Sequence, residues 1–255
     1  MKVLGILGAQ RKDGVTAKML AAVFQGIATD NTTEVIYLED FALKADVPGT
    51  ANPELDLIES KMRESDVWVL AAPTYWGSLS GRLKNLFDCL RQRLVRFDHT
   101  GTMHPASFKN KHYISLTNCY TSSFENMICG VTDASLRLCD KVMSAAGVIK
   151  IGEAVVTGTW GGMETLTPKK KKECLDLGHK INRIRRRDDQ TVKRYFELFF
   201  MVAVMALITM LLQKACASFI PLDNFWFNYL SFTVIFFILL ASMLHFVTFM
   251  KHKRH

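Results

Sequence analysis

The sequence predicts an α/β domain with a five-stranded parallel sheet, followed by a hydrophobic helical tail. Short apolar runs alternate with longer segments of helical periodicity, which is typical of a parallel sheet with right-handed crossovers and helices on both faces. The expected strands are residues 2–7, 34–38, 67–72, 112–117 and 151–156. The expected helices are residues 16–28, 54–64, 79–93, 123–146 and 168–186. Residues 196–212 and 227–250 are almost entirely apolar.

The clearest element is the third strand with the loop that follows it. Residues 67–72, VWVLAA, show no polar alternation, as expected of a central strand covered on both faces. Pro73 ends the strand, Tyr75 and Trp76 follow, and Gly77 permits close approach of the backbone. Ligands of open α/β sheets bind outside the carboxyl ends of the strands, so this loop lies where a ligand is expected. An ordinary βα turn with exposed aromatic residues is the alternative.

A second loop with ligand-binding character follows the first strand. It runs from Gly8 to Thr16, contains Gly14 and carries Arg11. Because it precedes a helix, its backbone N–H groups and the positive end of the helix dipole would attract a phosphate, with Arg11 and Thr16 as side-chain donors. The spacing is neither GxxxxGK[ST] nor GxGxxG, which disfavours a nucleoside-triphosphate site or a dinucleotide site of that type. A simple capped turn would explain the same residues.

The tail predicts two membrane-spanning helices, residues 196–212 and 227–250. The first run contains a single charged residue, Glu197, and the second contains none apart from a charge on His245. Both have lengths that can cross a hydrocarbon core of about 30 Å. A pair of buried core helices is the alternative interpretation.

Charge placement predicts the topology of this integral membrane protein. Lys and Arg concentrate before the first span and after the second, so by the positive-inside rule the large domain and the C-terminus both face the cytoplasm. The expected division is a domain over residues 1–187, a basic linker over 188–195, a helical hairpin over 196–250 and a basic tail over 251–255. The formal net charge of +8 is then explained largely by residues beside the membrane, which would attract anionic lipid. This placement disfavours nucleic-acid binding.

The sequence predicts no metal site. The six cysteines have neither paired CxxC spacing nor a zinc pattern, and five of them fall in the expected cytoplasmic domain, where reduced thiols are expected. His99 and His104 have no carboxylate or cysteine partner at ligand spacing.

Together, the two loops resemble those of the NADPH-dependent FMN reductase family. The second loop of the family, P-x-Y-x-G-x-x-S-G-x-L-K-x-x-x-D, is matched by Pro73, Tyr75, Gly77, Ser80, Gly81, Leu83, Lys84 and Asp88. The first loop, G-S-x-R-x-x-G-x-T, is matched by Gly8, Arg11, Gly14 and Thr16. Ala9 stands in place of the serine, and Val15 stands where asparagine is common. The resemblance covers residues 1 to about 185 and implies a flavodoxin-like, doubly wound sheet in the order 2-1-3-4-5.

The resemblance also implies a cofactor, FMN, and an electron donor, NADPH or NADH. The residues it assigns to the cofactor site are Gly8, Arg11, Gly14, Thr16, Pro73, Thr74, Tyr75, Trp76, Gly77, Asn118, Cys119 and Tyr120. No catalytic side chain is nominated, because the flavin supplies the redox chemistry. The family further implies a homodimer. No iron–sulfur cluster is expected, because residues 41–62 contain no cysteine.

The leading hypothesis is therefore a membrane-anchored, FMN-dependent NAD(P)H oxidoreductase that passes electrons to a quinone or another membrane redox partner. Ala9 and Val15 remove a hydroxyl and an amide, which motivates a first alternative, a membrane scaffold or sensor that has kept the fold without the cofactor. A second alternative is an FMN electron-transfer module reduced by a partner protein. A glycine- and aromatic-containing loop at residues 157–162 either shapes the substrate side or forms a surface turn.

Overall fold

The computed structural model describes residues 1–47, 49–160, 165–184, 190–215 and 224–252. The chain divides into two compact units, Met1–Ile184 and Arg185–Arg254.

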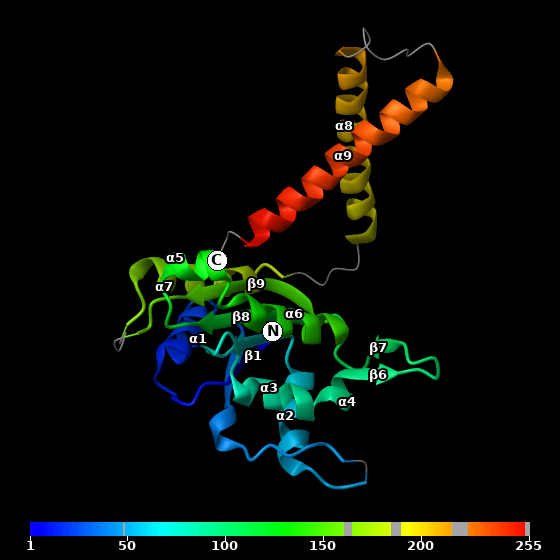
Figure 1. Ribbon diagram of the computed structural model, residues 1–255. Coiled ribbons are helices and arrows are strands. Elements are labelled where there is room, and N and C mark those ends of the chain that lie inside the picture. The colour runs from blue at the N-terminus through cyan, green and yellow to red at the C-terminus, as the bar shows by residue number, and fades with distance from the viewer. Residues whose placement is uncertain (48, 161–164, 185–189, 216–223, 253–255) are drawn as a thin grey trace. The chain divides into compact units, whose positions relative to one another are not determined.

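The first unit is built on a five-stranded parallel sheet (Figure 1). Its strands are β1 (Lys2–Leu7), β2 (Thr32–Tyr37), β3 (Val67–Ala71), β8 (His112–Asn118) and β9 (Ile149–Val156). The order β2-β1-β3-β8-β9 confirms the predicted order 2-1-3-4-5. Central β3 is buried at every residue, as its unbroken apolar run predicts. The carboxyl ends of β1, β3 and β8 are therefore neighbours at one edge of the sheet.

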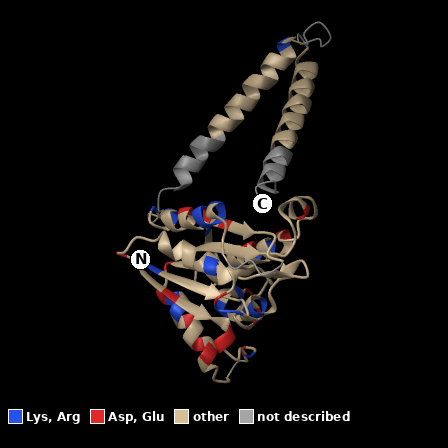
Figure 2. Cartoon of the chain, turned by 90° about the vertical axis from the view of Figure 1, so that its left-hand side faces the viewer, with Lys and Arg blue, Asp and Glu red and all other residues tan. Residues whose placement is uncertain are grey.

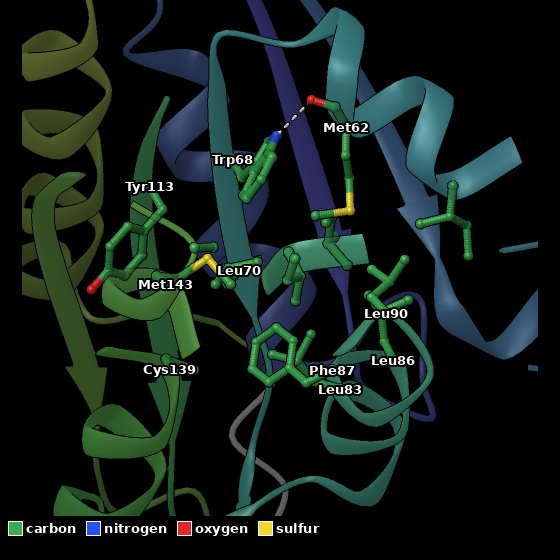
Figure 3. Close-up of a cluster of buried hydrophobic side chains, with 14 of the residues drawn as sticks. Met62, Trp68, Leu70, Leu83, Leu86, Phe87, Leu90, Tyr113, Cys139 and Met143 are labelled. Carbon is green, nitrogen blue, oxygen red and sulfur yellow. Dashed lines mark hydrogen bonds between the residues drawn. The ribbon is translucent and has the colours of Figure 1, made fainter. Parts of the chain in front are cut away.

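Helices cover both faces of the sheet. One face packs against α1 (Val15–Gln25) and α7 (Pro168–Ile181), and the other against α2 (Pro53–Glu64), α3 (Gly81–Cys89) and α6 (Asp133–Ala145). Alternate residues of β3 show the division, because Val67 and Val69 face the first layer while Trp68 and Leu70 face the second. Figure 3 shows the second core, where Trp68 donates a hydrogen bond to the Met62 carbonyl at 3.1 Å. The apolar body of Trp68 is fully buried, and its one polar atom is satisfied.

The structure corrects two predicted helices. The helix expected over residues 123–146 is divided into α5 (Ser123–Cys129) and α6, because Gly130 adopts φ +61° and caps α5. The helix expected over residues 79–93 begins later, at Gly81, and ends earlier, with the short α4 (Arg91–Leu94) after it. Residues 78–79 instead form a strand.

Two small hairpins and a short 3-10 helix, η1 (Leu38–Asp40), complete the first unit. The hairpins pair β4 (Thr74–Tyr75) with β5 (Ser78–Leu79) and β6 (Val95–Phe97) with β7 (Met103–Pro105). Arg93 holds the loop between η1 and α2 through Asp46. Its guanidinium donates two hydrogen bonds to the Asp46 carboxylate, at 2.7 and 2.8 Å. Arg93 also contacts Asp56 at 2.6 Å and Glu59 at 2.7 Å, so one half-buried cation holds three carboxylates.

The second unit contains two helices, α8 (Gln190–Ala215) and α9 (Phe225–His252). In Figure 2, few positions along their described parts are coloured as Lys, Arg, Asp or Glu. By length and composition, one segment of the described residues, Phe225–Met243, suffices to cross a membrane, and Phe199–Ala215 is a shorter apolar helix. Of the two predicted spans, the described chain thus offers one candidate. Buried Gln213 of α8 donates hydrogen bonds to α9, to the Asn228 carbonyl at 2.9 Å and to Ser231 Oγ at 2.7 Å.

Candidate functional site

A pocket of about 380 Å³ lies at the carboxyl ends of β1, β3 and β8. Its lining comes from the loops after β1 and β3, from the first turn of α1, from the last residue of β8 and from the loop after β9. The lining residues are Ala9, Gln10, Arg11, Asp13, Gly14, Val15, Thr16, Lys18, Pro73, Tyr75, Asn118 and Thr159. The pocket therefore joins the two loops singled out in the sequence, at the sheet edge where ligands of this architecture bind.

The pocket brings together six of the twelve predicted cofactor residues. Those that line it are Arg11, Gly14, Thr16, Pro73, Tyr75 and Asn118. The predicted residues outside its lining are Gly8, Thr74, Trp76, Gly77, Cys119 and Tyr120. Sequence reasoning missed four polar lining residues, Gln10, Asp13, Lys18 and Thr159. Gln10 and Asp13 fall at unspecified positions (x) of the family pattern for the first loop. Only their proximity to Arg11 in the sequence could have suggested that they line the pocket.

The loop after β1 offers donors to an anion. Gly14 is the N-cap of α1 and has no side chain, so no side-chain cap satisfies the first N–H groups of this helix. Arg11 stands beside them, and Lys18 adds a second cation to the lining. Uncapped N–H groups at the positive end of a helix dipole, next to a guanidinium, fit a phosphate group.

Gly8 serves packing at the base of this loop. A Cβ at Gly8 would lie 2.8 Å from Leu83 Cβ and 3.2 Å from the Leu83 backbone nitrogen, so only glycine lets β1 approach α3 this closely. Ser80 Oγ donates a hydrogen bond to the Gly8 carbonyl at 2.6 Å, and Gly8 N–H donates to the Ala71 carbonyl at 2.8 Å. The first and second loops are thus joined at their bases.

The loop after β3 is a tight hairpin whose central residues are Trp76 and Gly77. Both have positive φ, +54° and +69°, a conformation that glycine adopts readily and a bulky L-residue does not. Trp76 is fully exposed, whereas Tyr75 is about half exposed and lines the pocket. Trp76 thus combines a costly backbone conformation with full exposure, next in the chain to a residue that lines the pocket.

A chain of buried hydroxyls lies beneath this hairpin. Thr74 Oγ1 donates to Ser135 Oγ at 2.8 Å and contacts Thr117 Oγ1 at 2.9 Å. Because a hydroxyl has one proton, Thr117 is the donor to Thr74. The three side chains come from β4, α6 and β8, and all are buried. They fix the backbone that carries Tyr75 into the pocket.

The loops after β8 and β9 are held together by hydrogen bonds. Gly158 N–H donates to the Thr121 carbonyl at 2.6 Å, and Thr159 Oγ1 donates to the Cys119 carbonyl at 3.0 Å. Cys119 itself is buried, with its Sγ 3.1 Å from Thr121 Oγ1. Tyr120 and Trp160 form an edge-to-face pair with ring centroids 5.9 Å apart on the exposed side of these loops.

A further contact joins the first turn of α1 to the end of β8. Thr16 Oγ1 donates a hydrogen bond to Asn118 Oδ1 at 2.5 Å. This contact links α1 to the end of β8 across the floor of the pocket, and its two residues are far apart in the sequence. In the described part of the chain, no group of three or more His, Cys, Asp and Glu side chains is arranged to hold a metal ion.

Known proteins are similar to this chain in sequence. Residues 1–117 match the family model described as NADPH-dependent FMN reductase. An iron-sulfur flavoprotein of Methanocaldococcus jannaschii is 33% identical over 107 residues, 38% of this chain and 55% of the relative. A NAD(P)H:quinone oxidoreductase of Solanum tuberosum is 32% identical over 95 residues, 34% of this chain and 48% of the relative. The chain spans about half the length of these curated relatives.

Solved structures share the fold of the first unit. The NAD(P)H:quinone oxidoreductase from Methanothermobacter marburgensis has a TM-score of 0.61 at 12% identity, covering 72% of this chain and 98% of that one. An FMN-dependent NADH-azoreductase from Bacillus anthracis has a TM-score of 0.54 at 14% identity, covering 71% of this chain and 98% of that one. These similarities show the flavodoxin-like fold, and the sequence match to the NADPH-dependent FMN reductase family model spans residues 1–117 of it.

Proposed function

We propose that this protein is an FMN-dependent NAD(P)H oxidoreductase, anchored in a membrane, that passes electrons to a quinone or another membrane redox partner. The observation that carries the proposal is the pocket at the carboxyl ends of β1, β3 and β8, whose lining combines a helix N-terminus and Arg11 with Tyr75 and Asn118. Anion donors and an aromatic hairpin in one pocket are what a flavin phosphate and a flavin ring require.

Different residues of the pocket would bind different parts of the cofactor. Arg11 and the first turn of α1 would hold the phosphate, while Pro73 and Tyr75 would lie beside the ring. Asn118, held by Thr16, would contact the polar edge of the flavin. FMN held by these residues would supply the redox chemistry, namely hydride acceptance from a nicotinamide and onward electron transfer. The side chains bind and orient, so none is assigned a proton-transfer role.

The proposed anchor is a hairpin of two spans near residues 196–212 and 227–250, with residues 1–187 and the C-terminus on the cytoplasmic side. Its support is the candidate span Phe225–Met243, the apolar helix Phe199–Ala215 and the basic residues that flank both. Gln213 supports a packed helix pair, because its amide is satisfied by Asn228 and Ser231 of the other helix. A homodimer remains part of the proposal.

Flavin titration of the full-length protein in detergent tests the enzyme. We expect FMN to bind with quenching of its fluorescence, and NADPH or NADH to bleach the bound flavin rapidly in anaerobic stopped-flow experiments. Absence of flavin binding would favour the scaffold or sensor. Binding with slow reduction by both nucleotides would favour the electron-transfer module reduced by a partner protein.

The native cysteines allow a test of the topology without introduced labelling sites. Cys216 lies in the connector between the two proposed spans, and Cys129 is exposed in the first unit. A membrane-impermeant maleimide applied to intact cells should label Cys216 and should reach Cys129 only after permeabilisation. A Cys216→Ser variant should then take up no label from outside. Equal labelling of Cys129 in intact cells would contradict the proposed topology.

A further inference from the structure

We propose that Asp13 sets the affinity of the pocket for the phosphate of the flavin by competing for Arg11. The inference rests on the proposed function and concerns one property of that site, the discrimination between FMN and riboflavin. Arg11 Nε and Nη2 donate parallel hydrogen bonds to the two Asp13 carboxylate oxygens, at 3.0 and 3.1 Å. Both side chains line the pocket.

This ion pair occupies the Nε–Nη2 edge of Arg11, one of the two edges through which a guanidinium binds an oxyanion with two N–H donors. Guanidinium binds carboxylate and phosphate through the same planar pair of N–H donors, so the two anions exclude each other at that edge. A phosphate must displace Asp13 or bind next to a second negative charge. Riboflavin has no phosphate and meets neither cost.

Asp13 also lies next to the N-terminus of α1, where it has a second effect. A carboxylate near the positive end of a helix dipole already provides the negative charge that the helix end favours. Arg11 and, more weakly, Lys18 lower the pKa of Asp13, which keeps the carboxylate charged at neutral pH. The competitor is therefore present under all ordinary conditions.

Of the loop residues that line the pocket, Arg11 is the one cation; the second cation of the lining, Lys18, lies in α1. The single proton of the Thr16 hydroxyl goes to Asn118 Oδ1 at 2.5 Å, so Thr16 reaches a phosphate as a donor only if that bond breaks. Ala9 has no hydroxyl, and Gly14 has no side chain. Arg11 is consequently the residue at which competition has most effect.

The experiment compares dissociation constants for FMN and riboflavin, measured by flavin fluorescence on full-length protein in detergent. Asp13→Asn should tighten FMN binding about two- to fivefold, the range expected for release of a solvent-exposed ion pair. Riboflavin binding should not change. In an Arg11→Gln background, Asp13→Asn should lose most of its effect on FMN, because the competition no longer exists.

Asp40→Asn is the matched control. Asp40 pairs with Lys12 at 2.6 Å, is exposed and lies outside the pocket lining, so this variant removes one negative charge without freeing Arg11. FMN binding unchanged or weakened by Asp13→Asn would overturn the inference, as would equal tightening of riboflavin or an equal effect of Asp40→Asn. If the parent protein bound neither flavin, the proposed function would fail and this inference with it.

Discussion

The loops after β1 and β3 lie side by side at the pocket but are held by different forces. The loop after β3 has a buried foundation, in which Thr74 shares hydrogen bonds with Thr117 and Ser135. The tip of the loop after β1 instead carries the Arg11–Asp13 ion pair, with both side chains about three-quarters exposed. The second loop thus presents a fixed surface for a ring, whereas the first presents charges that a ligand can rearrange.

The largest effect on stability is expected where the bases of the two loops meet. Gly8→Ala would place a Cβ 2.8 Å from Leu83 Cβ and 3.2 Å from the Leu83 backbone nitrogen, neither of which is the end of a flexible side chain. We expect the free energy of unfolding to fall by about 3 kcal/mol, the upper end of the overpacking range. Urea denaturation of the full-length protein measures this change.

Gly81→Ala is the matched control, because a Cβ at this first residue of α3 meets nothing within 4 Å. That variant should be as stable as the parent or more stable by about 0.5–1 kcal/mol. Equal losses in both variants would show that Gly8 is not a packing residue and that the first loop has no rigid base.

The next largest loss of stability is expected when the hydrogen bonds between the buried hydroxyls are broken. Thr74→Val keeps the shape of the side chain but leaves the Thr117 donor and the Ser135 acceptor without this partner. The free energy of unfolding should fall by about 2 kcal/mol, as for buried polar groups that lose a partner. Thr74→Ser keeps the hydroxyl and should recover most of the loss. A double-mutant cycle with Thr117→Val should give a coupling energy clearly above zero, and additive losses would contradict a shared hydrogen bond.

A smaller effect of opposite sign is expected at Trp76. Its φ of +54° is costly for a bulky L-residue and its side chain is fully exposed, so Trp76→Asn should raise the free energy of unfolding by about 1 kcal/mol. If Trp76 packs beside the flavin ring, the same variant should bind FMN and riboflavin more weakly. Trp76→Phe keeps both the backbone strain and an aromatic ring, and it should resemble the parent. A loss of stability in Trp76→Asn would mean that the indole, and not the backbone, holds the hairpin.

The same contrast explains which features the sequence could predict. The unbroken apolar run of β3 and the glycines of the two loops are local signals, so they predict a central strand and the place of the pocket, whereas the strand order is implied only by the family resemblance. The Thr16–Asn118 and Thr74–Ser135 hydrogen bonds join distant segments, and no local pattern encodes them. Gly130 did carry a local signal, a glycine inside a helical pattern, that could have divided the predicted helix over residues 123–146. No local signal predicts the positive φ of Trp76, because tryptophan is not a typical residue of tight turns.

The smallest effect on stability is expected at the Arg11–Asp13 pair. Water and salt screen two side chains that are 76% and 75% exposed, so Asp13→Asn and Arg11→Gln should leave the urea midpoint unchanged at both low and high salt. The same two variants should change FMN affinity in opposite directions, because one frees the phosphate donor and the other removes it. This separation of affinity from stability is what distinguishes the first loop from the second. A fall in the midpoint for Asp13→Asn as large as that for Thr74→Val would show that the ion pair holds the first loop in place, and Asp13 would then be a structural residue and not a competitor for the ligand.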